Sequence, residues 1–160
     1  EDCFAEEPWC EVFAPGEAVT WLREMIRYQD NISLGWEVYF KRRIVGALFA
    51  FPVSFKNDVA AFLPESLKPE DVIYIAEAFV KKTFRNKGIA TKLHDECLAI
   101  AKRRGFSHAI ARTNLASKMY PIFEAKGYSV IGMQEVVSNK RVGDRIVLVP
   151  DERGIFLRSL

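Results

Sequence analysis

The sequence is poor in several kinds of residue, and each shortage argues against a class of protein. Only 3 of its 160 residues are cysteine and 2 are histidine, with no CxxC pair, so we expect neither a disulfide framework nor a metal site. No apolar run approaches the roughly 20 residues of a membrane-spanning helix, so we expect no membrane partner. The 23 Lys and Arg nearly balance the 21 Asp and Glu, so bulk charge does not favour binding to nucleic acid.

What remains is the composition of an ordinary globular protein. Apolar residues make up 49% of the chain and charged residues 28%, which excludes disorder and low-complexity repeats as a description of the whole. The length suits one domain over residues 1–160. The few cysteines fit a reducing cytoplasm, and the sequence starts at Glu1 without a basic and then apolar leader, so we expect no signal peptide.

The first half of the chain predicts a helix followed by two strands. Apolar residues recur at three- and four-residue spacing in Pro15–Tyr28, which is typical of an amphipathic helix packed on one face. In Trp36–Phe55 the pattern becomes alternating or continuously apolar around the basic turn Lys41–Arg43, which predicts a hairpin. The prolines and charges of Lys56–Asp71 predict a long connection with a short helical turn.

The second half begins with a strand and a strongly patterned helix. Val72–Val80 is rich in β-branched and aromatic residues, which favours a strand. The helix that follows ends at Arg104, with Gly105 placed to adopt the left-handed conformation beyond it. Its apolar stripe consists of Ile89, Leu93, Cys97, Ile100 and Ala101. We therefore expect Cys97 to be inert packing and His94, which lies off the stripe, to be exposed.

Further strands and a second helix complete the predicted domain. They are the strand Ser107–Thr113, the helix Ala116–Lys126 ended by Gly127, and the strands Tyr128–Val137, Arg145–Val149 and Gly154–Ser159. Asn114 or Ser117 is placed to cap that helix. The order of elements predicts a mixed α/β domain whose single sheet carries helices on its faces.

The sharpest chemical signal is the junction between the strand ending at Val80 and the following helix. A helix N-terminus presents unpaired backbone N–H groups and a partial positive charge, and together these bind phosphate. Gly88 and Ala90 allow close approach of a ligand, while Arg85 and Lys87 add charge and Thr91 adds a hydroxyl. These residues predict a pyrophosphate site without Mg²⁺. The alternative is an ordinary solvated basic turn, and neither a P-loop nor a dinucleotide fingerprint is present.

The segment Arg85–Ala90, R-N-K-G-I-A, stands where the GNAT superfamily of N-acetyltransferases has R/Q-x-x-G-x-G/A, and the chain resembles prokaryotic members of that superfamily. Glu77–Val80 is similar to the family's strand before this loop. Asn114–Tyr128 is similar to a later segment of the family, and Phe4–Trp9 looks like a start found in one group of members. The resemblance covers most of residues 4–137, although only Arg85–Ala90 is specific.

The resemblance implies a single mixed, mostly antiparallel sheet with helices on both faces and a splayed central parallel strand pair. It implies acetyl-CoA as cosubstrate, with its pyrophosphate on the loop and its pantetheine arm between the splayed strands. The cofactor-binding residues that it implies are Phe79, Val80, Arg85, Asn86, Lys87, Gly88, Ile89, Ala90, Thr91 and Asn114. Asn114 has a second interpretation, as the cap of the following helix.

Transfer of an acetyl group to an amine requires a base, because an ammonium has no lone pair. Glu77 lies in an otherwise apolar run where an unpaired charge is costly, so we predict it as the general base; the alternative is that it faces solvent or a structural cation. The family often supplies an acid Tyr where this chain has Phe123. Tyr120, one turn earlier, is the substitute we predict, unless it is core packing and the thiolate leaves unassisted.

The resemblance places the acceptor pocket against the N-terminal segment and the tail strands. The candidate residues are Phe4, Glu6, Glu7, Trp9, Glu11 and the loop Pro64–Asp71. Carboxylates with aromatic rings suit a cation, which favours a small-molecule primary amine or an exposed amino group, although these acids also fit an ordinary surface. The leading prediction is an N-acetyltransferase, monomer or homodimer. The alternatives are a non-catalytic acyl-CoA-binding module and, as the weakest, a nucleic-acid binder.

Overall fold

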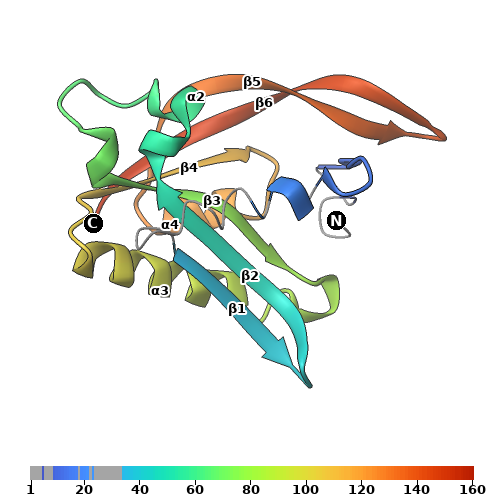
Figure 1. Ribbon diagram of the computed structural model, residues 1–160, viewed down its shortest axis with the longest axis horizontal. Helices are drawn as coiled ribbons and strands as arrows, with labels where there is room; N and C mark the ends of the chain where they lie inside the picture. Colours follow the sequence, from blue (N-terminus) through green and yellow to red (C-terminus); the bar gives the residue numbers. More distant parts are fainter. Residues whose placement is uncertain (1–4, 6–8, 18, 22, 24–33) are drawn as a thin grey trace.

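The computed structural model describes residues 5, 9–17, 19–21, 23 and 34–160, which form a six-stranded sheet in the order β1-β2-β3-β4-β6-β5 (Figure 1). The strands are β1 (Leu34–Phe40), β2 (Arg43–Pro52), β3 (Val72–Val80), β4 (His108–Asn114), β5 (Ser129–Val142) and β6 (Arg145–Ser159). Every neighbouring pair is antiparallel except β3 and β4, which are parallel. This confirms the predicted mixed sheet with a central parallel pair.

Helices lie on both faces of the sheet, as predicted (Figure 1). The helices are α2 (Asn57–Ala60), α3 (Ile89–Arg103) and α4 (Tyr120–Ala125), with 3₁₀ turns η1 (Val53–Phe55), η2 (Pro69–Asp71) and η3 (Lys82–Phe84). Ile73 and Ile75 of β3 point to the core beneath α3 and α4, whereas Val72 and Tyr74 point to the opposite core. The alternation along β3 therefore builds two cores, one on each side of a strand buried on both faces.

The predicted hairpin and connection are both confirmed. β1 and β2 are joined at Lys41 and Arg42, whose φ angles of 47° and 64° place both residues in the left-handed region, as the tightest hairpin turns require. Between β2 and β3 the chain forms η1, α2 and η2 rather than a strand. No helix in the described part of the chain combines the length and apolar character needed to cross a membrane.

Two predicted boundaries are wrong. β6 is one continuous strand, not two, and Pro150 lies within it. The half that holds Pro150 pairs with β5, but β4 pairs only with Arg153–Ser159, so the missing N–H of Pro150 takes no bond from the ladder with β4. The second helix is also shorter than predicted. The Ala116 N–H donates to the Asn114 Oδ1 at 2.7 Å and the Met119 N–H to the Ser117 Oγ at 3.2 Å, so these side chains hold turns before α4 rather than capping it.

The prediction for His94 is wrong as well. Its side chain is 0% exposed, and its Nε2 lies 3.0 Å from the hydroxyl of Tyr128. The ring also packs on Phe123, at 5.9 Å between centroids. The sheet covers one side of α3, but α4 and the start of β5 cover a second side, which the periodicity of the helix alone does not reveal. Cys97 is fully buried, as predicted.

Part of the predicted helix Pro15–Tyr28 lies outside the described residues. Residues 17, 19–21 and 23 are helical, and Pro15 lies in the turn that precedes them. Trp21 packs against the core on the α2 side of the sheet. This segment therefore adds a second helical element to the face opposite α3.

Candidate active site

The parallel strands β3 and β4 are paired at one end and separate at the other. Their register runs from Val72 opposite His108 to Ile75 opposite Ala111 and goes no further. On its other side β3 continues to pair with β2, but Ala76 is an extra residue there, because Phe49 faces Glu77 while Ala50 faces Ile75. The bulge and the separation leave the second half of β3 with one strand partner among the described residues, which confirms the splayed pair.

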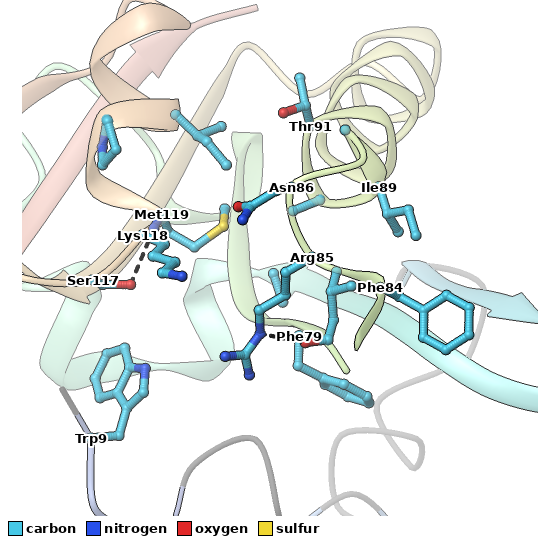
Figure 2. Close-up of a pocket in the computed structure, with 16 residues that line it drawn as sticks. Trp9, Phe79, Phe84, Arg85, Asn86, Ile89, Thr91, Ser117, Lys118 and Met119 are labelled. Carbon is cyan, nitrogen blue, oxygen red and sulfur yellow. Dashed lines mark hydrogen bonds between the residues drawn. The ribbon is translucent and has the colours of Figure 1, made fainter. Parts of the chain in front are cut away.

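A cavity of about 470 Å³ occupies the gap between the diverging elements. One wall is the end of β3 with the loop and first turn of α3, and the other is the segment from Ser117 to Ile122 that follows β4. Figure 2 shows Asn86 and Met119 approaching each other from these two walls, with Trp9 at one end of the opening. The cavity is mostly lined by apolar side chains, so it suits a slender, largely apolar arm with a polar head.

The loop before α3 leaves backbone N–H groups directed outward. Asn86 and Gly88 have φ angles of 60° and 74°, so the chain turns twice through the left-handed region around Lys87. The first hydrogen bond within the helix runs from the Lys92 N–H to the Gly88 carbonyl at 2.9 Å, so the amides of residues 88–91 lack a partner within the helix. A Cβ at Gly88 would meet no atom within 4 Å, which leaves room for a ligand there.

Arg85 is held against the end of β3. Its Nε donates to the carbonyl of Val80 at 2.8 Å, a bond that Figure 2 shows as a dashed line. The side chain is half-buried and forms part of the cavity wall. A guanidinium fixed beside the outward-facing amides supplies the full positive charge that an anionic ligand needs.

The predicted cofactor residues line the cavity with two exceptions. Lys87 does not line it, and its Nζ lies over the ring of Phe84 at 5.4 Å from the centroid. Asn114 does not line it either, because its Nδ2 donates to Asp151 at 2.6 Å and its Oδ1 accepts from Ala116. The Asn114 side chain therefore holds the turn that follows β4, and its predicted contact with the pantetheine arm stays a prediction.

Basic residues are concentrated in two segments, one of which forms part of the wall of this cavity. Residues 38–48 and 78–94 contain eight of the 23 basic residues of the chain and none of its 21 acidic residues. The two segments lie side by side, since Phe40 and Phe84 stack with their centroids 5.2 Å apart and Gly46 pairs with Val80. The near-neutral chain thus has a strongly positive end, which favours a polyanionic ligand.

Glu77 lines a second, smaller cavity of about 100 Å³ next to the first. The two cavities share Trp9, Ala78, Ser117 and Met119 in their walls. Burial, together with the nearby charge of Glu11, raises the pKa of Glu77 to about 8, against the lowering effect of Arg153 and Arg112. Glu77 is thus a carboxyl group that changes its charge close to neutral pH, inside a cleft.

The N-terminal segment forms part of this smaller cavity. Glu11 pairs with Arg153 at 2.5 Å, and the guanidinium of Arg153 lies over the ring of Trp9, 5.0 Å from its centroid. Of the residues predicted to wall the acceptor pocket, Trp9 and Glu11 line this cavity, whereas Phe4, Glu6 and Glu7 lie outside the described residues. The loop Pro64–Asp71 lines neither cavity.

Sequence reasoning missed two cations, Arg112 and Arg153, that line the smaller cavity. Arg112 pairs with Asp58 at 2.8 Å, and Arg153 also pairs with Asp151 at 3.1 Å. Arg153 falls in a stretch predicted as a link between strands, and no local pattern connects it to residues 142 positions away. Only the pairing of β6 with β4 and β5 brings it to the site.

Tyr120 lies away from both cavities. Its hydroxyl donates to Glu124 at 2.8 Å, which raises the pKa of Tyr120, and its ring packs edge-on against Phe156. Phe123 does line the smaller cavity but has no proton to give. The acid role of Tyr120 stays a prediction, and the described geometry offers it no path to the site.

The mixed sheet, the splayed parallel pair and the loop with outward-facing amides at the gap form the arrangement that the resemblance to acetyltransferases implied. Residues 4–121 match the model of the Acetyltransferase (GNAT) family. The match spans well over half of the chain, and the chain therefore belongs to this family. It is an acyltransferase, as the resemblance of its loop implied.

Solved structures share this fold at low sequence identity. The chain is similar to an N-acetyltransferase from Staphylococcus aureus Mu50 (14% identity, TM-score 0.65, 92% of this chain and 78% of that one). It is also similar to a phosphinothricin acetyltransferase from Sinorhizobium meliloti in complex with AcCoA (14%, TM-score 0.67, 99% and 79%) and to a ribosomal-protein-alanine N-acetyltransferase from Brucella melitensis (17%, TM-score 0.63, 99% and 90%). A comparison with curated proteins finds no match.

Proposed function

We propose that the protein is an N-acetyltransferase that moves an acetyl group from acetyl-CoA to a primary amine by direct transfer. The acceptor is a small molecule or an exposed amino group. The observation that carries this proposal is the position of Glu77, a carboxyl group with its pKa raised to about 8, in a small cavity that shares its walls with the larger cleft beside the anion-binding loop.

The larger cavity fits the donor. The amides of residues 88–91 and the guanidinium of Arg85 would hold the pyrophosphate, with the hydroxyl of Thr91 in the same wall. The backbone of Phe79 and Val80, at the end of β3 that lines the cavity, would pair with the pantetheine arm. When bound, acetyl-CoA supplies a thioester whose carbonyl carbon is open to attack by an amine.

The smaller cavity fits the amino end of the acceptor. Its volume of about 100 Å³ corresponds to about three water molecules, so it admits an amino group and a few further atoms. Glu77 lines it together with the ion pair of Glu11 and Arg153, and the ring of Trp9 adds an aromatic surface against which an amine can pack. We infer that the acceptor enters with an unbranched or otherwise slender amino end.

Glu77 takes the proton that blocks attack. An alkylammonium has a pKa near about 10.4, so raising the pKa of Glu77 from 4.5 to about 8 makes the proton transfer much less uphill. The freed lone pair of the nitrogen forms a bond to the acetyl carbonyl carbon while the carbon–sulfur bond breaks, and the nitrogen releases its second proton to solvent to give the neutral amide. The thiolate then takes its proton from solvent. No side chain in the described part of the chain is assigned to that last step.

Two measurements test the proposal. In a thermal-shift titration, acetyl-CoA at 100 times its dissociation constant stabilises the protein by about 2.7 kcal/mol, which raises the melting temperature by several degrees, whereas an RNA oligomer of similar charge leaves it unchanged. Free thiol is then followed with a panel of slender primary amines. Thiol release that depends on one of them supports the enzyme. Binding of acetyl-CoA without amine-dependent release from any of the panel would favour a non-catalytic acyl-CoA-binding module instead.

A further inference from the structure

The hairpin formed by β5 and β6 extends beyond the rest of the sheet (Figure 1). Its ladder runs without interruption from Gly132 opposite Ile155 to Val142 opposite Arg145. β4 accompanies β6 only from Arg153 onward, so the outer half is a two-stranded ribbon, supported at the edge of β5 by residues 10–12. A two-stranded ribbon of this kind has little stability of its own in water, so contacts made by its exposed surface would stabilise it.

Side chains alternate along the ribbon, so its two faces have different compositions. One face carries Asp151 and Arg153 towards the active site. The opposite face, here called the outer face, carries the four cross-strand pairs Glu135 and Glu152, Val137 and Pro150, Asn139 and Leu148, and Arg141 and Ile146. Val137, Ile146 and Leu148 are 58%, 55% and 70% exposed, so an apolar strip runs along the middle of a face that nothing in the described structure covers.

The charges on the outer face are arranged in opposite order at its two ends. Glu135 and Glu152 are directly opposite each other in the ladder, a like-charge pair that destabilises an isolated hairpin. Arg141 lies at the other end, opposite Ile146. Glu135 and Arg141 are each three residues from Ser138. A half-turn about an axis at Ser138 therefore exchanges the acidic end with the basic end.

From this arrangement we infer that the outer face binds the outer face of a second copy of the chain, around a twofold axis at Ser138. In such a dimer Arg141 faces the partner's Glu135 and the partner's Glu152, and Leu148 packs against the partner's Val137. Each contact occurs twice, as in any interface between identical surfaces. The association covers the apolar strip and offsets the repulsion between the two carboxylates.

The size of the surface sets the expected strength. Eleven residue pairs at about 3.4 Å each, over two strands spanning about 10 Å, give roughly 400 Å² per copy, which is about half of a standard interface. We therefore expect a dimer that dissociates in the micromolar range rather than a permanent one.

Sedimentation velocity of the full chain between about 1 µM and about 1 mM tests the proposal. We expect the average mass to rise from one copy towards two as concentration increases. Leu148→Glu places a charge in the apolar strip and is expected to weaken association at least tenfold. Arg141→Glu sets like charges against each other and should do the same, whereas Lys68→Glu, the same charge reversal at an exposed site in the turn before η2, should leave it unchanged.

A double variant that exchanges the charges at positions 135 and 141 tests whether these two residues meet across the twofold axis. Adding Glu135→Arg to Arg141→Glu restores attraction across the twofold axis, so the double variant should associate more tightly than Arg141→Glu alone. Circular dichroism and the melting temperature check that each variant is folded. A wild-type chain that stays monomeric up to about 1 mM, a Leu148→Glu variant that still dimerises, or a folded double variant no tighter than Arg141→Glu would each overturn the proposal.

Discussion

The two ends of the β3–α3–β4 unit are built from the same elements and differ in how completely their polar groups are paired. At one end β3 and β4 pair from Val72 and His108 onward, and the Ser107 N–H donates to the Asp71 carbonyl at 2.9 Å. There α3 ends with Phe106 donating to Ala101 and Gly105 donating to Lys102, both at 3.1 Å, which satisfies the last carbonyls of the helix.

At the other end the same strands separate and the first amides of α3 have no partner within the helix. Glu77 is held there in an environment that disfavours its charge. The closed end therefore contributes stability, while the open end keeps polar groups available for ligands. A change at the open end should therefore affect binding and rate, and a matched change at the closed end should affect stability alone.

The largest effect is expected at the open end from Glu77→Gln. The carboxylate is the active form of the base, so the kcat/KM of the wild type should rise with pH through about 8 and level off above it. The variant keeps the shape of the side chain but cannot accept the proton. We expect its kcat/KM to fall at least about 100-fold and to lack the rise near pH 8.

Tyr120→Phe is the control for this substitution. Its hydroxyl is bonded to Glu124 and faces neither cavity, so we expect less than about a twofold change in kcat/KM. A Glu77→Gln enzyme with an unchanged pH profile would exclude Glu77 as the base. A large loss in Tyr120→Phe would instead support the predicted acid role for this tyrosine.

The next largest effect is on stability and comes from His94, which lies on the side of α3 that α4 and the start of β5 cover. Burial lowers the pKa of His94 to about 4 from 6.5, with the charge of Asp95 acting in the opposite direction. Between these values the unfolded chain binds more protons than the folded one, so stability is complete above pH 6.5 and decreases as the pH falls towards 4. The loss attributable to this group is about 3 kcal/mol.

Denaturant unfolding of the wild type and of His94→Gln at several pH values measures this contribution. Gln retains a hydrogen-bonding group for Tyr128 but does not titrate, so the difference in free energy of unfolding should be constant above pH 6.5 and narrow as the pH falls to 4. If the free energies of unfolding of the two proteins change in parallel with pH over this whole range, His94 does not cause the loss of stability at low pH.

The smallest effect is the most direct comparison of the two ends. Gly88 and Gly105 both have left-handed φ angles, 74° and 90°, and a Cβ at either would meet no atom within 4 Å. Alanine at each position should therefore cost a similar amount of stability, about 1 kcal/mol. Gly88→Ala should also weaken acetyl-CoA binding about tenfold, because the new methyl group occupies ligand space, whereas Gly105→Ala should not. Isothermal titration measures the affinity of each variant for acetyl-CoA. Equal affinities for the two variants would show that the loop does not form part of the binding site.

Much of the fold followed from local pattern. The hairpin around Lys41, the strand Val72–Val80 and the helix ended by Gly105 are each marked by residues a few positions apart, because backbone preference and hydrophobic period act over that range. The loop proposed to bind the anion is equally local, since one glycine and the residues beside it form it. Its conformation therefore depends on neighbouring residues that the sequence itself displays.

Tertiary structure alone decided the rest. The burial of His94 depends on α4 and β5 packing over a second side of α3, and the continuity of β6 through Pro150 depends on where β4 stops. Glu11 and Arg153 meet beside Glu77 only because β6 crosses the sheet between β4 and β5. The sequence by itself determined the strand, the turn and the helix that can hold a phosphate, because those depend on neighbouring residues. The raised pKa of Glu77 depends on which distant groups exclude water from it, and only the assembled fold establishes that.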